Sequence, residues 1–305
     1  MLIEKVKIEN FGLFVGKHEL EFSINKQKKL NLIIGPNGSG KTQLFNLMSL
    51  CLYGKQGTQF HEFTDVEPLF LSDSIANNLG NNQTAITRVE MNLIFENKSY
   101  VTKREVNYKK IDGDIAVAST KTKYSKYFHS IFPNPSFIFV KNIGSVIENF
   151  NQTHINSEKL DKVIQKMNLI NQKSQFKYFA NSEFRYIDNK IQLIGDKEPL
   201  ELQAAGRKAT LDFIFLSSIR GILIPNSVLI VDGPFNYITE EFVIPIYNIL
   251  LEYLPQIIFL DTYLHNPNLE KKQGIVYELV SEQEISRTVI RRFRTSYADS
   301  YTNYS

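Results

Sequence analysis

Eight consecutive residues have the types and the spacing of a loop that binds a triphosphate. They fit the pattern G-x-x-x-x-G-K-[ST] at every position. The glycines allow backbone N–H groups to turn inward around phosphates, and a helix beginning near Lys41 adds the positive end of its dipole. We expect Lys41 to reach the β- and γ-phosphates and the Thr42 hydroxyl to bind magnesium. The predicted site for ATP with Mg²⁺ therefore consists of Gly35, Pro36, Asn37, Gly38, Ser39, Gly40, Lys41 and Thr42.

The segments on either side of this loop argue against a chance glycine-rich turn. Residues 28–34 become increasingly apolar and stop at Gly35, which is typical of a central strand buried on both faces. Residues 42–53 carry many apolar side chains and precede Gly54, a common helix terminator. The order strand, loop, helix is the one that the motif requires.

A magnesium ion bound through one hydroxyl and phosphate oxygens also needs a nearby carboxylate. Four apolar residues at 228–231 lead directly into Asp232. This pattern predicts a buried strand with Asp232 at its carboxyl end, next to the loop if the two strands are neighbours. A helix-capping aspartate after a core strand is the alternative. We predict that Thr42 and Asp232 hold the metal.

The remaining periodicity predicts an α/β protein. Strands are predicted at 2–9, 17–23, 86–108 (a hairpin), 136–140, 184–194 (a strand pair), 228–231 and 256–260, and near 276–280 and 288–293. Helices are predicted at 155–172, 206–222 and 239–253. The strands within 2–23 and 86–108 are expected to form a curved sheet beside the main sheet.

Composition indicates an ordinary globular protein. The 305 residues are 43% hydrophobic and 22% charged, enough to bury one or two cores. The single cysteine, Cys51, excludes an internal disulfide, and its apolar neighbours predict a buried, inert thiol. The N-terminus alternates apolar and charged residues, and no stretch reaches the roughly 18 apolar residues of a membrane span. We expect a cytoplasmic protein without a membrane segment.

Six motifs, in order, resemble those of the ATPase heads of the SMC, RecF and DndD group, which are ABC-type ATPases of chromosome maintenance, double-strand-break repair and phage defence. The motifs are IENFGLF, GPNGSGKT, FVKNIGSVI, LQAAGRK, VLIVDGPFNYI and QIIFLDT. The resemblance covers nearly the whole chain and implies a P-loop NTPase fold. It implies a mostly parallel central sheet flanked by helices, plus an antiparallel β subdomain. Residues 1–305 would form one head, with lobe I at about 1–140, a helical and hairpin insertion at about 120–200, and lobe II at about 200–305.

The family arrangement implies a dimer. In these ATPases two heads sandwich two ATP molecules, and each head gives its signature motif to the nucleotide on the other. The similar segment here is 203–208, in which Ala204 stands where a serine usually bonds the partner's γ-phosphate. Gly206 and the following helix remain, so the resemblance assigns Ala204 and Gly206 to nucleotide binding across a homodimer or heterodimer.

Other positions depart from the family pattern where the γ-phosphate is detected or attacked. Asn142 stands where these heads have a glutamine, Gly233 where most have a water-orienting glutamate, and Thr262 where they have a switch histidine. His265 is a candidate substitute for that histidine, with an ordinary surface-loop histidine as the alternative. Glu240 and Glu241 are candidates for the missing base. The catalytic candidates are therefore Asn142, Glu240, Glu241 and His265.

These departures predict that ATP binding survives better than hydrolysis, because the loss of a positioned base typically slows a reaction by about two to four orders of magnitude. We expect a slow ATPase head, without the coiled-coil arm of its relatives, that controls a separate effector or nuclease partner. A hydrolysis-deficient ATP-binding scaffold is the rival hypothesis. A small-molecule P-loop kinase is disfavoured, because the later motifs follow the ABC order.

Two groups of basic residues are candidates for DNA contacts. Lys121 to Lys126 interleave with Tyr124 and Tyr127, and a terminal group comprises Arg287, Arg291, Arg292 and Arg294. A solvated strand edge that discourages pairing with other strands explains these residues equally well.

Overall fold

The computed structural model of the protein describes most of the chain. The described residues are 1–53, 71–124, 137–141, 143–150, 157–173, 179, 181–188, 190–196, 203–223, 228–235, 238, 240–262, 273–282 and 287–292. Only the backbone is described for Tyr124, Ser157, Glu240, Glu241, Gln273 and Glu282.

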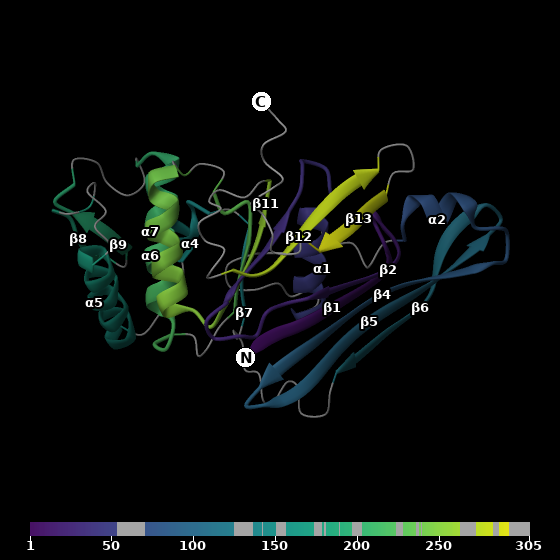
Figure 1. Ribbon diagram of the computed structural model, residues 1–305, viewed down its shortest axis with the longest axis horizontal. Coiled ribbons are helices and arrows are strands. Elements are labelled where there is room, and N and C mark those ends of the chain that lie inside the picture. The colour runs from purple at the N-terminus through teal and green to yellow at the C-terminus, as the bar shows by residue number, and fades with distance from the viewer. Residues whose placement is uncertain are drawn as a thin grey trace.

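A six-stranded sheet forms the centre of the molecule (Figure 1), with the strand order β13-β12-β3-β11-β10-β7. The strands are β3 (Leu30–Ile34), β7 (Phe137–Val140), β10 (Val228–Asp232), β11 (Gln256–Asp261), β12 (Gln273–Glu282) and β13 (Arg287–Arg292). Neighbouring strands pair in parallel, except for the antiparallel pair β12–β13. Because β3, β7 and β11 are buried at every residue, both faces of the sheet are covered.

A second, five-stranded sheet is wholly antiparallel and extends to the lower right of the central sheet in Figure 1. Its order is β2-β1-β4-β5-β6. The strands are β1 (Leu2–Phe11), β2 (Phe14–Glu21), β4 (Thr84–Phe95), β5 (Lys98–Ile111) and β6 (Asp114–Tyr124). This sheet is the antiparallel subdomain that the sequence predicted beside the main sheet.

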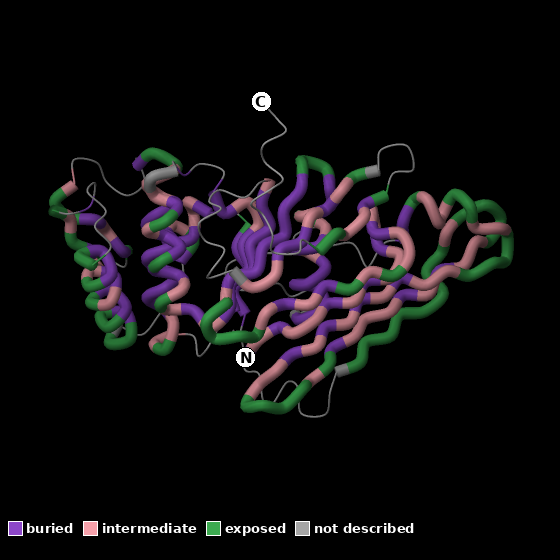
Figure 2. The backbone as a smooth tube through the Cα atoms, viewed as in Figure 1, coloured by how far each residue is buried: buried purple, intermediate pink, exposed green. Residues whose placement is uncertain are grey.

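Strand β6 was not predicted from the sequence. None of its described side chains is buried, so it lacks the apolar alternation that reveals a half-buried strand. The strand runs along the exposed edge of the five-stranded sheet in Figure 2. Its position is set by pairing with β5, which local sequence patterns do not record.

Helix α1 (Lys41–Tyr53) lies between the two sheets and joins them through one core. Its buried side chains belong to the same cluster as Met91 and Val106 of the five-stranded sheet and Ile258 of the central sheet. Phe45 packs edge-on against Phe139 of β7, with ring centroids 5.3 Å apart. The helix that follows the glycine-rich loop is therefore fixed on both sides.

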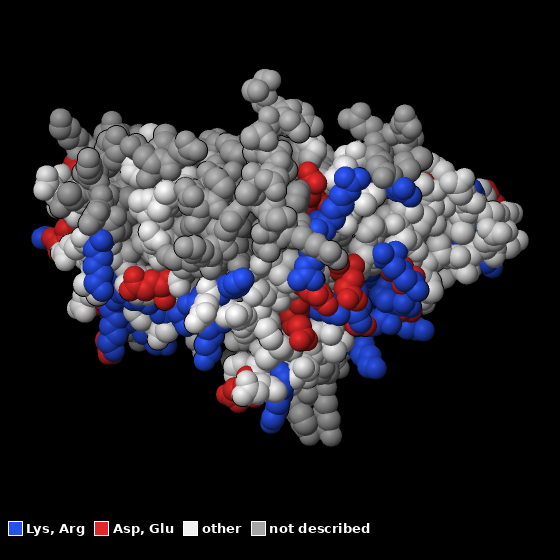
Figure 3. Space-filling view, viewed as in Figure 1, with Lys and Arg blue, Asp and Glu red and all other residues white. Residues whose placement is uncertain are grey.

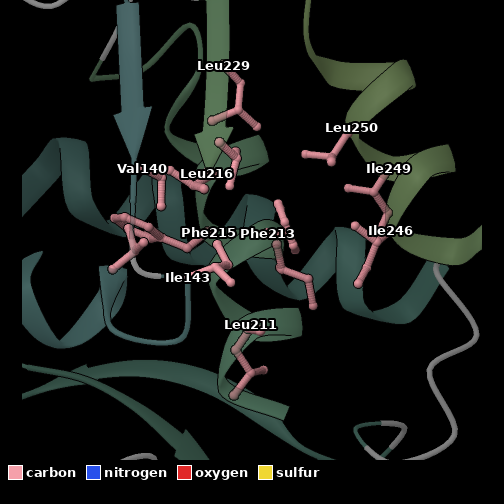
Figure 4. Close-up of a cluster of buried hydrophobic side chains, with 14 of the residues drawn as sticks. Val140, Ile143, Leu211, Phe213, Phe215, Leu216, Leu229, Ile246, Ile249 and Leu250 are labelled. Carbon is pink, nitrogen blue, oxygen red and sulfur yellow. The ribbon is translucent and has the colours of Figure 1, made fainter. Parts of the chain in front are cut away.

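Helices α6 (Ala205–Ile219) and α7 (Glu240–Tyr253) contribute to the other main core with strands of the central sheet. Figure 4 shows buried side chains of both helices gathered around Leu229 of β10 and Val140 of β7. The elements beyond are α5 (Ser157–Lys173) and the hairpin β8 (Glu183–Ile187) with β9 (Lys190–Ile194). Two short helices, α2 (Asp73–Asn78) and α4 (Val146–Phe150), complete the described elements.

One buried glutamine connects the two sheets directly. Gln256, at the start of β11, accepts a hydrogen bond from the Ile3 N–H and donates to the Ile3 carbonyl, both at 2.7 Å. It also donates to the Ser23 carbonyl at 3.1 Å. Because β1 shifts register between Ile3 and Lys5, the glutamine satisfies backbone groups at this irregularity.

Cys51 lies within α1 and is completely buried, as predicted. Burial raises the pKa of its thiol to about 12, because the thiolate would lose its hydration. The thiol is therefore held in its unreactive form. Among the helices that the structure describes, we find none with the length and apolar content needed to cross a lipid bilayer.

Candidate functional site

The glycine-rich loop connects β3 to α1 in the order that the sequence predicted. Gly38 and Gly40 have φ angles of +81° and +92°, a region that side chains with a Cβ rarely adopt. Gly35 donates its N–H to the Asp261 carbonyl at 3.0 Å. A Cβ on Gly35 would lie 2.7 Å from the Leu279 carbonyl oxygen, so only glycine fits against β12 there.

The Lys41 ammonium lies inside the curve of this loop. It donates hydrogen bonds to the Gly35 carbonyl at 2.6 Å and to the Pro36 carbonyl at 2.8 Å. Burial lowers the pKa of the ammonium, while the nearby carboxylates of Asp232 and Asp261 oppose that shift. The positive charge is therefore held where the sequence predicted a phosphate contact.

Thr42 and Asp232, the predicted metal ligands, are in direct contact. The Thr42 hydroxyl donates to the Asp232 carboxylate, with 2.6 Å between the oxygens. Burial raises the pKa of the Asp232 carboxyl, and the Thr42 hydrogen bond and the Lys41 charge act in the opposite direction. One hydroxyl and one carboxylate that converge in this way are oxygen ligands of the kind that Mg²⁺ prefers.

We expected the strand before the loop, β3, and the strand that ends at Asp232, β10, to be neighbours, but they are not. Strand β11 lies between β3 and β10, so Asp232 does not stand beside the strand that precedes the loop. The contact forms because Thr42 belongs to the first turn of α1, which packs against β10 and β11. The expected proximity of Thr42 and Asp232 is therefore observed, although the condition that we attached to it, adjacent strands, is wrong. Their role as metal ligands stays a prediction.

These groups open onto a cavity of about 360 Å³. The cavity is lined by Leu13, Asn37, Gly38, Gly40, Lys41, Thr42, Gln43, Lys141, Asp232, Gly233 and Thr262. Sequence patterns gave no signal for Leu13 and Gln43, which come from the β1–β2 turn and from α1. A volume of this size suits a small phosphorylated ligand.

The segment after β7 forms another wall and is fixed to α6. Lys141 lines the cavity, whereas Asn142, our predicted counterpart of the family glutamine, lies outside the described residues. The buried Asp212 of α6 accepts hydrogen bonds from the N–H groups of Gly144, Val146 and Ile147 at 2.6 to 2.9 Å. Burial raises the pKa of Asp212 to about 7, opposed by these three donors.

The predicted signature segment begins α6 on the surface. Ala204 is the N-cap residue of the helix, is exposed, and makes no side-chain capping hydrogen bond. Gly206 is partly exposed. Neither residue is among the described residues that line the cavity. The start of α6 is therefore open to solvent and takes no part in the described lining of the cavity.

The remaining catalytic candidates are only partly described. His265 lies outside the described residues, and Glu240 and Glu241 are described at the backbone alone, in the first turn of α7. Thr262 lines the cavity. The buried Asp261 beside it, which we did not predict as a site residue, accepts a hydrogen bond from the Thr262 N–H at 2.7 Å.

Gly233 has a structural reason to be glycine. Its φ angle is +64°, and its N–H donates to the Leu260 carbonyl at 2.8 Å. A glutamate at this position would have to adopt left-handed backbone geometry, which costs about 1 kcal/mol for a residue other than glycine. The backbone here thus opposes a glutamate, the residue that the resemblance leads us to expect at this position.

We expect Gly233→Glu and Gly233→Ala to lower the free energy of unfolding by about 1 kcal/mol, or roughly 2 °C in thermal midpoint, because both need the strained backbone. Gly233→Asn is expected to lose less, since asparagine tolerates the left-handed region. Thermal unfolding of the three variants checks this order. A stabilised Gly233→Ala variant would contradict it.

Several basic side chains around the five-stranded sheet are paired with acids. Arg88 contacts Glu9 at 2.8 Å and Glu105 at 2.9 Å, and Lys7 contacts Glu90 at 2.8 Å. Figure 3 shows blue and red side chains interspersed on the visible face of this region. These pairs reduce the positive potential that the sheet presents to a polyanion.

The predicted basic groups lie on two separate edge strands. Lys121 and Lys123 are exposed on β6, and Arg287, Arg291 and Arg292 lie on β13. Arg292 contacts Glu21 at 3.2 Å. Lys126 and Arg294 lie outside the described residues. Their placement at sheet edges agrees with both alternatives considered for them, phosphate contact and protection of the edge.

Comparison with known proteins identifies the fold. The SMC head domain from Thermotoga maritima superposes with a TM-score of 0.59 over 96% of this chain and 100% of that chain, at 15% identity. An SMC head bound to the C-terminal winged-helix domain of ScpA gives a TM-score of 0.61 over 97% and 98% of the two chains, at 13% identity. The chain thus has the fold of an SMC-like ATPase head.

Sequence comparison finds a shorter similarity. The SbcC component of the nuclease SbcCD from Staphylococcus aureus strain JH9 is 42% identical over 65 residues, which are 21% of this chain and 6% of that protein. The same similarity is found for SbcC of strain Newman. The match thus covers only a small part of these relatives.

The family model described as an AAA domain matches residues 5–212, which include the glycine-rich loop, the segment after β7 and the start of α6. Because the match covers more than half of the chain, this protein belongs to the AAA domain family, and its fold is that of SMC heads.

Proposed function

We propose that this protein is an ATP-binding head that dimerises when ATP is bound and thereby controls a partner effector or a DNA transaction, in DNA repair or in defence against phage. The observation that carries the proposal is the convergence of Lys41, Thr42 and Asp232 on one cavity. Lys41 would neutralise phosphate charge. Thr42 and Asp232 would hold Mg²⁺, which takes its other ligands from phosphate and water.

Dimerisation is supported by the position of the signature-like segment. Ala204 and Gly206 lie at the solvent-exposed start of the otherwise buried α6, and neither is among the described residues that line the cavity. A helix N-terminus attracts an anion, so this segment suits the γ-phosphate of a nucleotide held by a second head. The second head is either another copy of this chain or a related protein. The hydrogen bonds to Asp212 connect the same helix to the wall that contains Lys141.

A separate partner protein is part of the proposal. SbcC is named as one component of a nuclease, and one of the similar SMC heads is bound to a ScpA domain. By analogy with these proteins, a nuclease or another effector would read the ATP-dependent state of this head. Direct DNA contact would use the exposed Lys121 and Lys123 or the arginines of β13.

Hydrolysis by this head is proposed to be slow. Gly233 provides no base, and Thr262 cannot serve as one at neutral pH. The alternative function, a scaffold that binds ATP without hydrolysing it, is favoured by the left-handed backbone at Gly233. Single-turnover phosphate release distinguishes the two, because a slow head releases one phosphate per bound ATP whereas a scaffold releases none.

Two substitutions at Ala204 test the ATP-driven dimer with matched effects on the helix. Serine and aspartate are both good N-cap residues, so each keeps or improves the start of α6. Serine adds a donor for a partner's γ-phosphate, and we expect Ala204→Ser to tighten the ATP-dependent dimer about tenfold. Aspartate adds a negative charge, and we expect Ala204→Asp to abolish the dimer while ATP binding remains.

The measurement is sedimentation velocity over a range of protein concentrations, with magnesium and either ATP or ADP. We expect dimers with ATP and none with ADP. The fraction of dimer with ATP should be highest for Ala204→Ser, intermediate for the wild type and lowest for Ala204→Asp. Equal dimerisation of the serine and aspartate variants would place the contact elsewhere. A wild type that binds ATP and stays monomeric at every concentration would overturn the self-dimer and leave only assembly with a related protein.

A further inference from the structure

The C-terminal hairpin β12–β13 lies against the phosphate loop, although the two lie far apart in the sequence. Strand β12 pairs with β3 as far as Ile34, the last residue before the loop. Its Leu279 carbonyl, together with the Ser39 hydroxyl, leaves no room for a Cβ on Gly35. Strand β13 pairs with β12, so that Thr288 stands opposite Ser281.

Thr288 bonds the phosphate loop with its side chain. Thr288 is 1% exposed, and its hydroxyl donates to the Ser39 carbonyl at 3.0 Å. Ser39 is itself buried, and its own hydroxyl has no hydrogen-bond partner among the described residues. The loop at this point is therefore held through its backbone carbonyl by a side chain from the far end of the chain.

The direction of this hydrogen bond matters for the cavity. The Ser39 carbonyl and the Gly40 N–H belong to one planar peptide unit, and in a trans peptide they point in opposite directions. Holding the carbonyl toward Thr288 turns the Gly40 N–H away from β13. Gly40 lines the cavity, and loops of this type bind phosphate through such N–H groups.

Thr288 also fixes a second wall of the cavity. Its N–H donates to the Leu13 carbonyl at 2.7 Å, and the Leu13 N–H donates to the Gln43 side-chain oxygen at 3.1 Å. Leu13 and Gln43 both line the cavity. One residue of β13 therefore sets the position of the β1–β2 turn and of the phosphate loop together.

We propose that Thr288 is a positioning residue of the nucleotide site, and that through it the C-terminal hairpin controls the affinity of the phosphate loop for a nucleoside triphosphate. This inference rests on the proposed ATP site. The new element is that Thr288, which does not line the described cavity, orients the Gly40 N–H toward a phosphate. A disturbance of β13 would then reach the nucleotide without any change in Lys41, Thr42 or Asp232.

Thr102 provides a matched control. It is 0% exposed, and its hydroxyl also donates to a backbone carbonyl at 3.0 Å, that of Cys51 in α1. It lies in β5 and is not among the described residues that line the cavity. Thr102→Val and Thr288→Val therefore each remove one buried hydroxyl donor and keep the shape of the side chain. Of the two hydroxyls, only that of Thr288 is bonded to the phosphate loop.

The experiment measures the ATP dissociation constant with magnesium, and the thermal midpoint, for the wild type, Thr288→Val, Thr288→Ser and Thr102→Val. We expect Thr288→Val to weaken ATP binding about tenfold, the scale of one hydrogen bond. Thr288→Ser, which keeps the hydroxyl, should stay within about threefold of the wild type. Thr102→Val should lose thermal stability with unchanged affinity.

Unchanged ATP affinity in a folded Thr288→Val variant would overturn the inference and leave the proposed function intact. A wild type that binds no ATP would overturn both. If Thr288→Val does not fold, Thr288→Cys replaces it, because the thiol has a similar volume and is only a weak donor. The same tenfold criterion then applies to the cysteine variant.

Discussion

Replacing Lys41 with alanine is expected to weaken ATP binding on the order of a hundredfold, and with it to remove ATP-driven dimerisation. Lys41 lines the cavity, and its ammonium donates to the Gly35 and Pro36 carbonyls, so a positive charge is held beside the proposed phosphate site. Its loss removes a partly buried positive charge from an anion site. Titration with ATP and sedimentation with magnesium and ATP measure the two effects.

Lys29 supplies the control for this variant. Its ammonium is also partly buried and also donates to a backbone carbonyl, that of Leu251, at 2.9 Å. It precedes β3, whereas Lys41 follows the strand, so it lies at the opposite end. Lys29→Ala should therefore keep ATP affinity within about twofold, since it touches no part of the site. Equal losses in both variants would mean that Lys41 acts through stability alone.

Replacing Asp232 with asparagine is expected to remove the gain in ATP affinity that magnesium gives, a loss of about ten- to a hundredfold. The carboxylate is the charged member of the Thr42–Asp232 pair, and an amide oxygen is a weaker ligand for a hard cation. The Thr42 hydroxyl can still donate to the amide oxygen, so the local packing is retained. ATP titrations with magnesium and with a chelator measure how much magnesium raises the ATP affinity of the wild type and of Asp232→Asn.

The same site is expected to depend on pH. Burial raises the pKa of Asp232, so the carboxylate is protonated at a higher pH than an exposed aspartate. Because magnesium binds only the deprotonated form, its effect on ATP affinity should shrink as the pH falls toward that raised pKa and be complete above it. Phosphate titrates near pH 6 on its own, so the difference between wild type and Asp232→Asn isolates the protein group. Identical pH profiles would contradict the assignment.

The phosphate loop and the elements around it were predictable because their signals are local. The apolar run of β3, the glycines with positive φ and the apolar side chains of α1 follow one another directly in the sequence. Asp232 was predictable for the same reason, since it directly follows the buried residues of β10. Glycine and apolar patterning thus located the loop and the carboxylate that line one cavity, for which we propose a phosphate and a metal.

Groups held by tertiary contacts were not predictable in this way. Strand order is set by pairing between distant segments, so the sequence did not reveal that β11 separates β3 from β10. Nothing in the local sequence distinguishes Asp212 from other helical residues, because its role comes from the N–H groups after β7 that donate to its carboxylate. Thr288 is separated from Ser39 by 249 positions, and no periodicity relates them. These contacts depend on how the elements pack.

The left-handed backbone at Gly233 gives a structural reason for glycine where the family pattern has glutamate. From the sequence, glycine in place of the usual glutamate is a missing base. In the structure it is also the residue that allows the chain to turn after β10, with its N–H bonded to Leu260. The proposed slow hydrolysis would thus follow from the turn geometry as well as from the side chain.

The decisive measurement for the proposed nucleotide site is equilibrium binding of ATP to the purified wild-type protein, with and without magnesium. We expect saturable binding of one ATP per chain, tighter with magnesium, through Lys41, Thr42 and Asp232. A folded protein that takes up no ATP at millimolar concentration under either condition would contradict it.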